Sequence, residues 1–345
     1  MDEKGYVFTP MTVLLFIPII IIAISYGNIV NEANLLANLA TGGDVTISTA
    51  TSVYSNIEKA ATDAGRNSAY NATRKVIDDN NFFVSGDSKS YIRQRILDSV
   101  NANVINSTKE IEYQTGRQVY INNILIDNYT NATFKLSDIT INQTDPFGFY
   151  VNVKGGIPVK VVQKGQSFEG RTPPISVYVT IEGLEDPYVW IKTKYRSSNI
   201  IYKYPYYTNI AGETNYYFDD DVDKQENIIN HLYYCLNGTN NPSNITPRSY
   251  YFVDPNGLSF FDRLENKTTS ADANITRMST FIIGDPLYED HGRADISRLD
   301  REYFAKPLVI GTPIKIGKSN MADPSGVTFY LSPAYKTYFK LKNSY

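Results

Sequence analysis

Cysteine and histidine are both scarce in this chain of 345 residues, and each shortage excludes a class of protein. Cys235 is the only cysteine, so no disulfide can form within the chain and core packing must hold the fold together. His231 and His291 are the only histidines, and the Cys/His spacing of zinc sites does not occur. A surplus of positive charge is also missing, since 33 basic residues face 36 acidic ones. We therefore expect no disulfide scaffold, no zinc site and no nucleic-acid partner.

Signature motifs of enzymes are missing too. The sequence contains no G-x-S-x-G, P-loop, H-E-x-x-H or dinucleotide-binding fingerprint. His231 and Cys235 stand four residues apart on an expected helix, where an imidazole and a thiol would share one face for catalysis or metal binding. The flanking leucines and tyrosines favour a buried helix instead, with Cys235 as a small apolar side chain. We expect a non-enzymatic protein without catalytic residues, and a secreted hydrolase with an unfamiliar site is the less favoured alternative.

Only one long hydrophobic run is present, and it lies at the beginning of the chain. Residues 6–26, YVFTPMTVLLFIPIIIIAISY, carry no charged side chain. As a helix rising about 1.5 Å per residue, this run would reach roughly 30 Å, the thickness of the hydrocarbon core of a bilayer. We therefore expect residues 6–26 to bind the membrane, with the C-terminal bulk of the chain outside the cell.

Three interpretations of this run differ in how the N-terminus is processed. A secretory signal would be cleaved after the small residues Ala23 and Ser25, which would release a soluble protein beginning at Tyr26. An uncleaved anchor needs only the run itself. The third interpretation rests on Lys4-Gly5, which stands directly before the apolar stretch.

Lys4-Gly5 followed by an apolar helix resembles the class III signal of type IV pilins, especially of archaeal pilin-like proteins. The resemblance covers about the first 40 residues. It implies cleavage between Gly5 and Tyr6 on the cytoplasmic side, and a helix that anchors the protein or packs against copies of itself or other pilin-like subunits. Family members usually carry Glu at the fifth position after the cut, where this chain has Pro10. This difference bears on filament assembly more than on anchoring.

Apolar residues at three- and four-residue spacing predict that the helix continues past the run and that further helices follow it. One helix is expected from about Met11 to Ala40, ending at Gly42-Gly43. A second helical segment is expected over Asp44–Asp78 and a third over Ser88–Ile105.

From Arg117 the apolar period changes to two, which predicts strands. Short connections between them favour an antiparallel meander, with a hairpin turn at Lys154-Gly155-Gly156. A further helix is expected over Asn227–Leu236. The fold class is α+β, with a long N-terminal hydrophobic helix and helical segments before a mainly antiparallel β ectodomain.

These patterns divide the chain into consecutive segments. They are a cytoplasmic leader (1–5), a transmembrane and stalk helix (6–40), a helical segment (44–110), an antiparallel β-domain (117–185) and a second β-rich domain with short helices (186–345).

Asparagine sequons of the form Asn-x-Ser/Thr all lie beyond the apolar run, where an external glycosylation machinery would reach them. They are Asn71, Asn106, Asn128, Asn131, Asn142, Asn237, Asn244, Asn266 and Asn274. Their distribution supports an outside location for the bulk of the chain and is compatible with an archaeal or eukaryotic source.

Two further patterns suggest ligand binding. Asp219, Asp221 and Asp223 alternate as in the start of a calcium loop, although the Gly and Glu that complete an EF-hand are missing. A solvated acidic loop is the default interpretation, so we expect no cofactor, with calcium at these aspartates as the alternative. A group of tyrosines would line a carbohydrate- or partner-binding face or pack in a sheet. They are Tyr202, Tyr204, Tyr206, Tyr207, Tyr216 and Tyr217.

The sequence as a whole favours a non-enzymatic cell-surface protein. We expect a pilin-like subunit or a membrane-anchored structural or adhesive glycoprotein. An extracellular module that binds carbohydrate or calcium is the alternative.

Overall fold

A computed structural model describes residues 5–126, 133–163, 166–195, 200–204, 222–238, 249–270, 276–283 and 296–341. At residues 5–21, 23–24, 27–28, 34–45 and 222–227 it describes the backbone alone. The chain forms two compact units, and each combines segments that are far apart in the sequence. Unit 1 comprises Met1–Asn56, Val104–Thr133 and Gly156–Thr172, and unit 2 comprises Ile57–Asn103, Phe134–Gly155 and Pro173–Tyr345.

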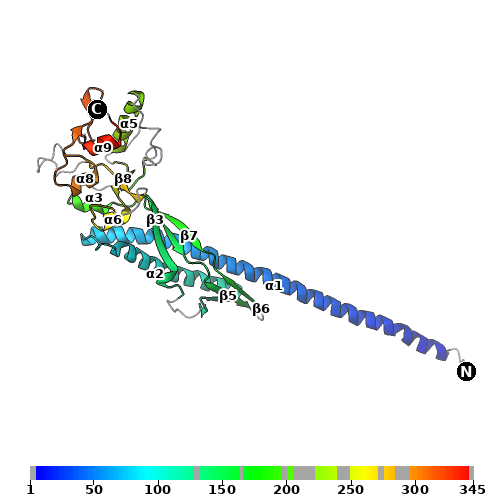
Figure 1. Ribbon diagram of the computed structural model, residues 1–345. Coiled ribbons are helices and arrows are strands. Elements are labelled where there is room, and N and C mark those ends of the chain that lie inside the picture. The colour runs from blue at the N-terminus through cyan, green and yellow to red at the C-terminus, as the bar shows by residue number, and fades with distance from the viewer. Residues whose placement is uncertain are drawn as a thin grey trace. The chain divides into compact units, whose positions relative to one another are not determined.

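Two long helices, α1 (Gly5–Asp79) and α2 (Asp87–Thr115), form the first part of the chain (Figure 1). The predicted helix end at Gly42-Gly43 is wrong, because α1 passes through both glycines and includes the segment predicted as a second helix. A glycine inside a helix costs only about 1 kcal/mol relative to alanine, so two glycines weaken a long helix without ending it. The predicted end at Ile105 is also too early, since α2 continues to Thr115.

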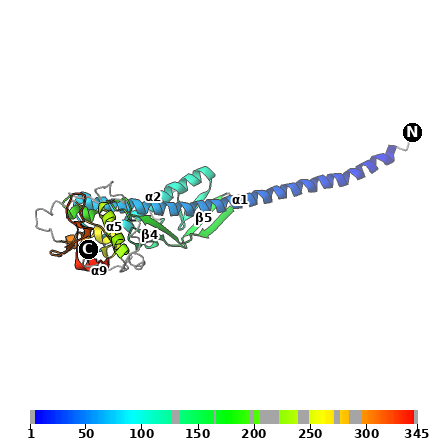
Figure 2. The same cartoon turned by 90° about the horizontal axis from the view of Figure 1, so that it is seen from above.

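The apolar stripes predicted on the helices are buried. On α1 the buried stripe includes Val53, Ile57, Ala60, Ala61 and Ala64. On α2 it consists of Ile92, Ile96, Val100 and Val104, which are all fully buried. Figures 1 and 2 both show α2 beside the C-terminal part of α1. The four-residue spacing is therefore confirmed as the signature of helix-packing faces.

Unit 1 contains an antiparallel sheet with the strand order β2-β1-β5-β6. Its strands are β1 (Gln118–Ile121), β2 (Ile124–Leu125), β5 (Pro158–Gln163) and β6 (Gln166–Arg171). Asn122 and Asn123 form the two-residue turn between β1 and β2. Both have positive φ, 54° and 63°, which asparagine tolerates better than most residues.

Unit 2 contains an antiparallel sheet with the strand order β3-β4-β7. Its strands are β3 (Ile139–Asp145), β4 (Gly148–Val153) and β7 (Ile175–Thr180). Alternate residues of β7 are buried, as the period of two predicts. Gly65 of α1 lies against this sheet, because a Cβ atom there would stand only 2.5 Å from Cγ2 of Val179.

The predicted hairpin at Lys154-Gly155-Gly156 is wrong. The strand before these residues, β4, pairs with β3 and β7, whereas the strand after them, β5, pairs with β1 and β6. The two strands therefore belong to different sheets. The physical reason is that β4 pairs with β7 without a break along its whole length, from Gly148 opposite Thr180 to Val153 opposite Ile175.

The C-terminal part of unit 2 is built from short elements around an aromatic core. They are α3 (Pro187–Lys192), α5 (Val222–Asn237), β8 (Phe252–Leu258), α6 (Phe260–Leu264), β9 (Met278–Ser279), α8 (Asp300–Ala305), β10 (Thr312–Pro313), β11 (Lys315–Ile316), β12 (Ser319–Asn320), β13 (Tyr330–Leu331) and α9 (Pro333–Tyr338), whereas the 3₁₀ helix η1 (Leu136–Asp138) directly precedes β3. The helix predicted at Asn227–Leu236 is confirmed as α5. Phe252, Phe281 and Phe339 pack with the apolar face of α5 in one buried cluster. The fold class is α+β with mainly antiparallel sheets, as predicted.

Candidate functional site

The predicted anchor and its processing site lie at the start of α1. Gly5 and Tyr6 begin the helix, but their side chains are outside the described residues. Further along, Ile22, Tyr26 and Ile29 are 67%, 69% and 61% exposed. They stand four and three residues apart, so they share one face of the helix. In the part of the chain that the structure describes, no helix combines the length and the hydrophobicity that crossing a membrane requires.

The predicted glycosylation sites differ in exposure. The side chains of Asn71, Asn106, Asn142 and Asn266 are exposed. Asn237 is fully buried at the end of α5, and its Nδ2 donates a hydrogen bond to the carbonyl oxygen of Tyr233 at 3.0 Å. The remaining sequons, Asn128, Asn131, Asn244 and Asn274, lie outside the described residues. Exposure therefore separates Asn237 from the other described sequons.

The side chains of the three aspartates in the predicted calcium loop lie outside the described residues. Asp219 and Asp221 lie outside the described residues, and only the backbone of Asp223 is described, in α5. Among the residues with described side chains, no group of three or more His, Cys, Asp or Glu is placed to hold a metal ion. Calcium binding by these three aspartates stays a prediction.

His231 and Cys235 lie on a buried helix, which confirms the favoured interpretation. Cys235 is buried in the aromatic core, and its Sγ donates to the carbonyl oxygen of Tyr250 at 3.3 Å. Burial raises the pKa of the Cys235 thiol well above its ordinary value and lowers the pKa of His231. A nucleophilic cysteine needs a lowered pKa and access to substrate. The arrangement therefore suits packing and not catalysis.

The predicted tyrosine face is described at two positions only. Tyr204 is fully buried, and its hydroxyl lies 2.9 Å from Nδ1 of His231. Tyr202 is half-buried. The others, Tyr206, Tyr207, Tyr216 and Tyr217, lie outside the described residues. Tyr204 therefore belongs to the core and not to a binding face.

A buried charge cluster is the largest feature that the sequence patterns missed. Arg263 of α6 donates from Nη1 to Oδ2 of Asp186 at 2.7 Å and from Nη2 to Oδ2 of Asp300 at 2.5 Å. All three side chains have 0% exposure. The guanidinium carbon of Arg263 also lies 5.6 Å and 5.5 Å from the ring centroids of Tyr188 and Tyr251. One arginine therefore joins two carboxylates and two aromatic rings.

The electrostatics of this cluster favour a structural role. Burial opposes the charge on Arg263, but Asp300 and Asp186 outweigh it and raise the pKa of Arg263. Burial also raises the pKa of Asp300 to about 6, although Arg263 opposes this shift. Asp186 additionally caps α3 by accepting from the backbone N–H of Tyr188 at 3.0 Å. Since the three charged side chains pair with one another and are fully enclosed, the cluster holds α3, α6 and α8 together and offers no surface for a substrate.

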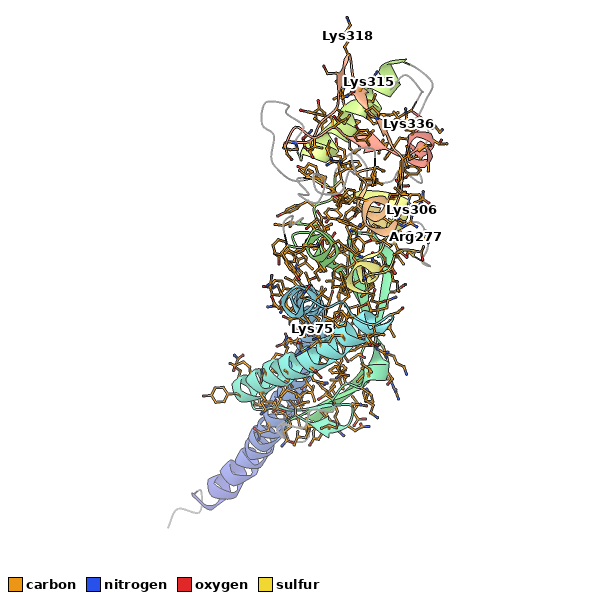
Figure 3. All side chains as sticks on the ribbon, turned by 90° about the vertical axis from the view of Figure 1, so that its left-hand side faces the viewer. Lys75, Arg277, Lys306, Lys315, Lys318 and Lys336 are labelled. Carbon is orange, nitrogen blue, oxygen red and sulfur yellow. The ribbon has the colours of Figure 1, made fainter. Side chains whose placement is uncertain are left out.

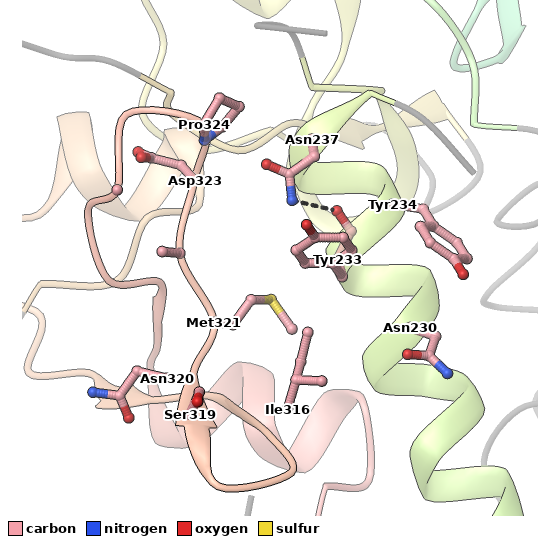
Figure 4. A pocket seen from close by; sticks show the side chains of 12 residues that line it. Asn230, Tyr233, Tyr234, Asn237, Ile316, Ser319, Asn320, Met321, Asp323 and Pro324 are labelled. Carbon is pink, nitrogen blue, oxygen red and sulfur yellow. Dashed lines mark hydrogen bonds between the residues drawn. The ribbon is translucent and has the colours of Figure 1, made fainter. Parts of the chain in front are cut away.

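An open pocket of about 560 Å³ lies between α5 and the segment that contains β11 and β12 (Figure 4). Asn230, Tyr233, Tyr234 and Asn237 line it from α5. The other lining residues are Ile316, Ser319, Asn320, Met321, Ala322, Asp323, Pro324 and Gly326. Figure 4 shows Tyr233 and Met321 extending from opposite sides, with Ile316 nearby. The pocket combines aromatic rings, amides and a small apolar surface.

The chain matches no protein-family model, no curated protein and no solved structure.

Proposed function

We propose that the chain is a non-enzymatic cell-surface protein, held in the membrane by residues 6–26 and carrying its C-terminal bulk outside the cell. It serves as a pilin-like subunit or as a membrane-anchored structural or adhesive glycoprotein. The observation that carries this proposal is the continuity of α1, which joins the uncharged apolar run to an α+β fold through one helix. A helix of 75 residues is about 110 Å long, several times the roughly 30 Å of a bilayer core.

Exposed apolar side chains on α1 support the proposal. Apolar surface of Ile22, Tyr26 and Ile29 is exposed to water. Exposed apolar surface has an unfavourable free energy of about 25 cal/mol per Å² relative to buried surface. A run of exposed apolar surface is typical of a contact with a membrane or with another protein chain. Lipid would cover this face in an anchored protein, and copies of the chain or other pilin-like subunits would cover it in a filament.

The pilin-like version of the proposal rests on Lys4-Gly5 and on the helix that follows. The first helix of a pilin spans the membrane and protrudes from it, and the absence of a break at Gly42-Gly43 makes α1 suited to that role. Pro10 stands where an assembling pilin carries its glutamate, so anchoring is the better supported half of the proposal.

The mature N-terminus decides among the three processing routes. We expect mass spectrometry of protein from the membrane fraction to find Tyr6 as the first residue. Gly5→Leu should then leave Met1 in place, whereas the matched variant Ser25→Leu should have no effect on processing.

Other outcomes would overturn parts of the proposal. A first residue of Tyr26, with cleavage blocked by Ser25→Leu, would indicate a released secretory protein. Met1 in the wild-type protein would reject the pilin-like route and keep the anchor. Electron microscopy of producing cells that shows only dispersed membrane particles would reject the filament.

A further inference from the structure

We propose that the pocket between α5 and the β11–β12 hairpin binds a neutral saccharide. Nothing in this proposal depends on how the N-terminus is processed or whether the chain is anchored. The chain would then have a second function besides its proposed structural one, the recognition of a sugar on another molecule.

The size and composition of the pocket suit a sugar. Its volume of about 560 Å³ lies within the roughly 300–1,000 Å³ of ligand sites. Tyr233 and Tyr234 supply aromatic surface, and Ile316 and Met321 supply aliphatic surface. A pyranose ring has an apolar C–H face that packs on such side chains, while its hydroxyls remain at the edge.

Polar groups at the pocket match the hydroxyls of a sugar. Asn230 is half-buried on α5, and Ser319 and Asn320 are exposed on the hairpin. An amide offers two donors and one acceptor oxygen, so a single Asn can bind two neighbouring hydroxyls. These groups come from both walls of the pocket, Asn230 from α5 and Ser319 and Asn320 from the hairpin.

The charges of the described lining residues favour a neutral ligand. Asp323 is the only charged residue among the described residues that line the pocket, and its carboxylate is hydrogen-bonded within the protein. Its Oδ1 accepts from the backbone N–H groups of Ser325 and Val327 at 3.0 Å, and its Oδ2 accepts from Arg298 at 3.4 Å. Lys315 and Lys318 are exposed on the hairpin (Figure 3), and neither belongs to the lining of the pocket. Among the described lining residues, neither a cation nor an anion would therefore meet an unpaired opposite charge.

The walls of the pocket are fixed before any ligand arrives. Met321 is buried, its N–H donates to the carbonyl oxygen of Ile314, and its own carbonyl accepts from Phe329, both at 2.7 Å. On the other wall, Leu232 and Leu236 attach α5 to the aromatic core. A preformed site loses little conformational freedom on binding, which suits the weak interactions of sugars.

Saturation-transfer NMR on the full-length chain tests the proposal with the neutral probes cellotriose, mannotriose and triacetylchitotriose. The detergent must lack a sugar headgroup, because a maltoside would compete. We expect at least one trisaccharide to receive saturation. Asn320→Ala should weaken its binding about two- to tenfold through the loss of a hydrogen bond. Tyr233→Ala should abolish the binding, and Tyr233→Phe should keep most of it because the ring remains.

Matched controls make the result decisive. Lys318→Ala alters the same hairpin outside the pocket and should leave binding unchanged. Thermal unfolding of each variant shows whether the fold is retained, and Asn320→Ala is informative in any case because its side chain is exposed. No saturation of any probe would overturn the proposal, and so would binding that survives both Asn320→Ala and Tyr233→Ala. Preferential binding of a uronic acid trimer would overturn its neutral character.

Discussion

Arg263 shows how much one buried charge can depend on its partners. Its two carboxylate partners, Asp186 and Asp300, are as fully enclosed as the guanidinium itself. Removing the arginine would leave two uncompensated carboxylates in the core. Breaking a buried ion pair in this way costs about 3–5 kcal/mol, even where the intact pair contributes little.

We therefore expect Arg263→Met to lower the free energy of unfolding by about 3–5 kcal/mol, measured by urea denaturation. Arg74→Met is the matched control, because Arg74 also contacts two carboxylates, Asp78 and Glu185, but is 34% exposed. Its loss should cost under about 1 kcal/mol. Equal effects of the two substitutions would contradict the structural role of the buried cluster.

Glu265 makes the stability of unit 2 depend on pH. Its Oε1 accepts from the hydroxyl and, at 3.3 Å, from the backbone N–H of Ser88 near the start of α2, and its Oε2 lies 2.8 Å from Nζ of Lys267. Burial opposes ionisation, but the hydrogen bonds from Lys267 and Ser88 outweigh it and hold the pKa of Glu265 below its ordinary value of 4.5. The stabilisation is therefore complete above pH 4.5 and is lost as the pH falls through the folded-state pKa.

Glu265→Gln should destabilise the fold by about 1.5–3 kcal/mol at pH 7, since it removes hydrogen bonds to a charged group. The difference between wild type and variant should shrink below pH 4.5, where the wild-type carboxylate also becomes neutral. Urea denaturation at several pH values measures both effects. Glu58→Gln, at an exposed position of α1, is the control. A difference that stays constant from pH 7 to pH 3 would refute the assignment.

Individual residues were predictable from the sequence only where their neighbours decide their environment. The burial of Cys235 follows from the apolar residues around it on one helix. The cluster around Arg263 does not, because Asp186 and Asp300 lie 77 and 37 residues away from it in the sequence. Pairing of distant charges leaves no periodic signal in a sequence.

At the scale of elements, the contact between α1 and the β3-β4-β7 sheet depends on a missing side chain. A Cβ atom on Gly65 would lie 2.5 Å from Cγ2 of Val179 and 3.2 Å from Cγ2 of Val151. Both valines lie on paired strands, and their short side chains cannot move aside as a long, flexible side chain would. Gly65 therefore sets how closely the helix approaches the sheet.

This contact reverses the usual effect of a glycine-to-alanine change in a helix. On propensity alone, Gly65→Ala would stabilise the fold by about 1 kcal/mol. We expect it to destabilise the fold by about 1–3 kcal/mol because of overpacking. Thermal unfolding gives the sign directly. In the Val179→Ala background the same change should cost less, and an equal cost there would mean that no clash occurs.

Local periodicity predicted elements better than it predicted their partners. The stripes on α1 and α2, the strand pattern and α5 are all confirmed, because each follows from spacing within one segment. The prediction of a hairpin at Gly155-Gly156 is wrong, because β4 pairs with β7, which lies more than 20 residues further along the chain. The prediction of a helix end at Gly42-Gly43 is wrong because the free-energy cost of two glycines, about 1 kcal/mol each, is too small to end a helix of this length.

At the scale of the whole molecule, neither unit is a continuous piece of chain. Unit 1 takes its strands from residues 104–133 and 156–172, and the β3–β4 pair of unit 2 lies between them in the sequence. The chain crosses between the units within both α1 and α2. A fragment cut out by sequence position, such as residues 117–185, would therefore contain parts of both units.

The exposed sequons connect this fold to the proposed location outside the cell. Asn71 lies on α1, Asn106 on α2, Asn142 on β3 and Asn266 after α6, and a glycan on any of them would extend into solvent. Asn237 differs, because its buried Nδ2 is already hydrogen-bonded to Tyr233. Attachment of a sugar there would remove that bond and force a bulky group into the core.

We therefore expect glycopeptide mass spectrometry of protein from its own cells to find glycans on exposed sequons and none on Asn237. Asn71→Gln should remove one glycan without lowering the unfolding temperature, since the side chain is exposed. A fully glycosylated Asn237 would contradict the placement of α5. If Asn71, Asn106, Asn142 and Asn266 all carried no glycan, the sequons would no longer support an external location. Four exposed acceptor sites would then have met no glycosylation machinery.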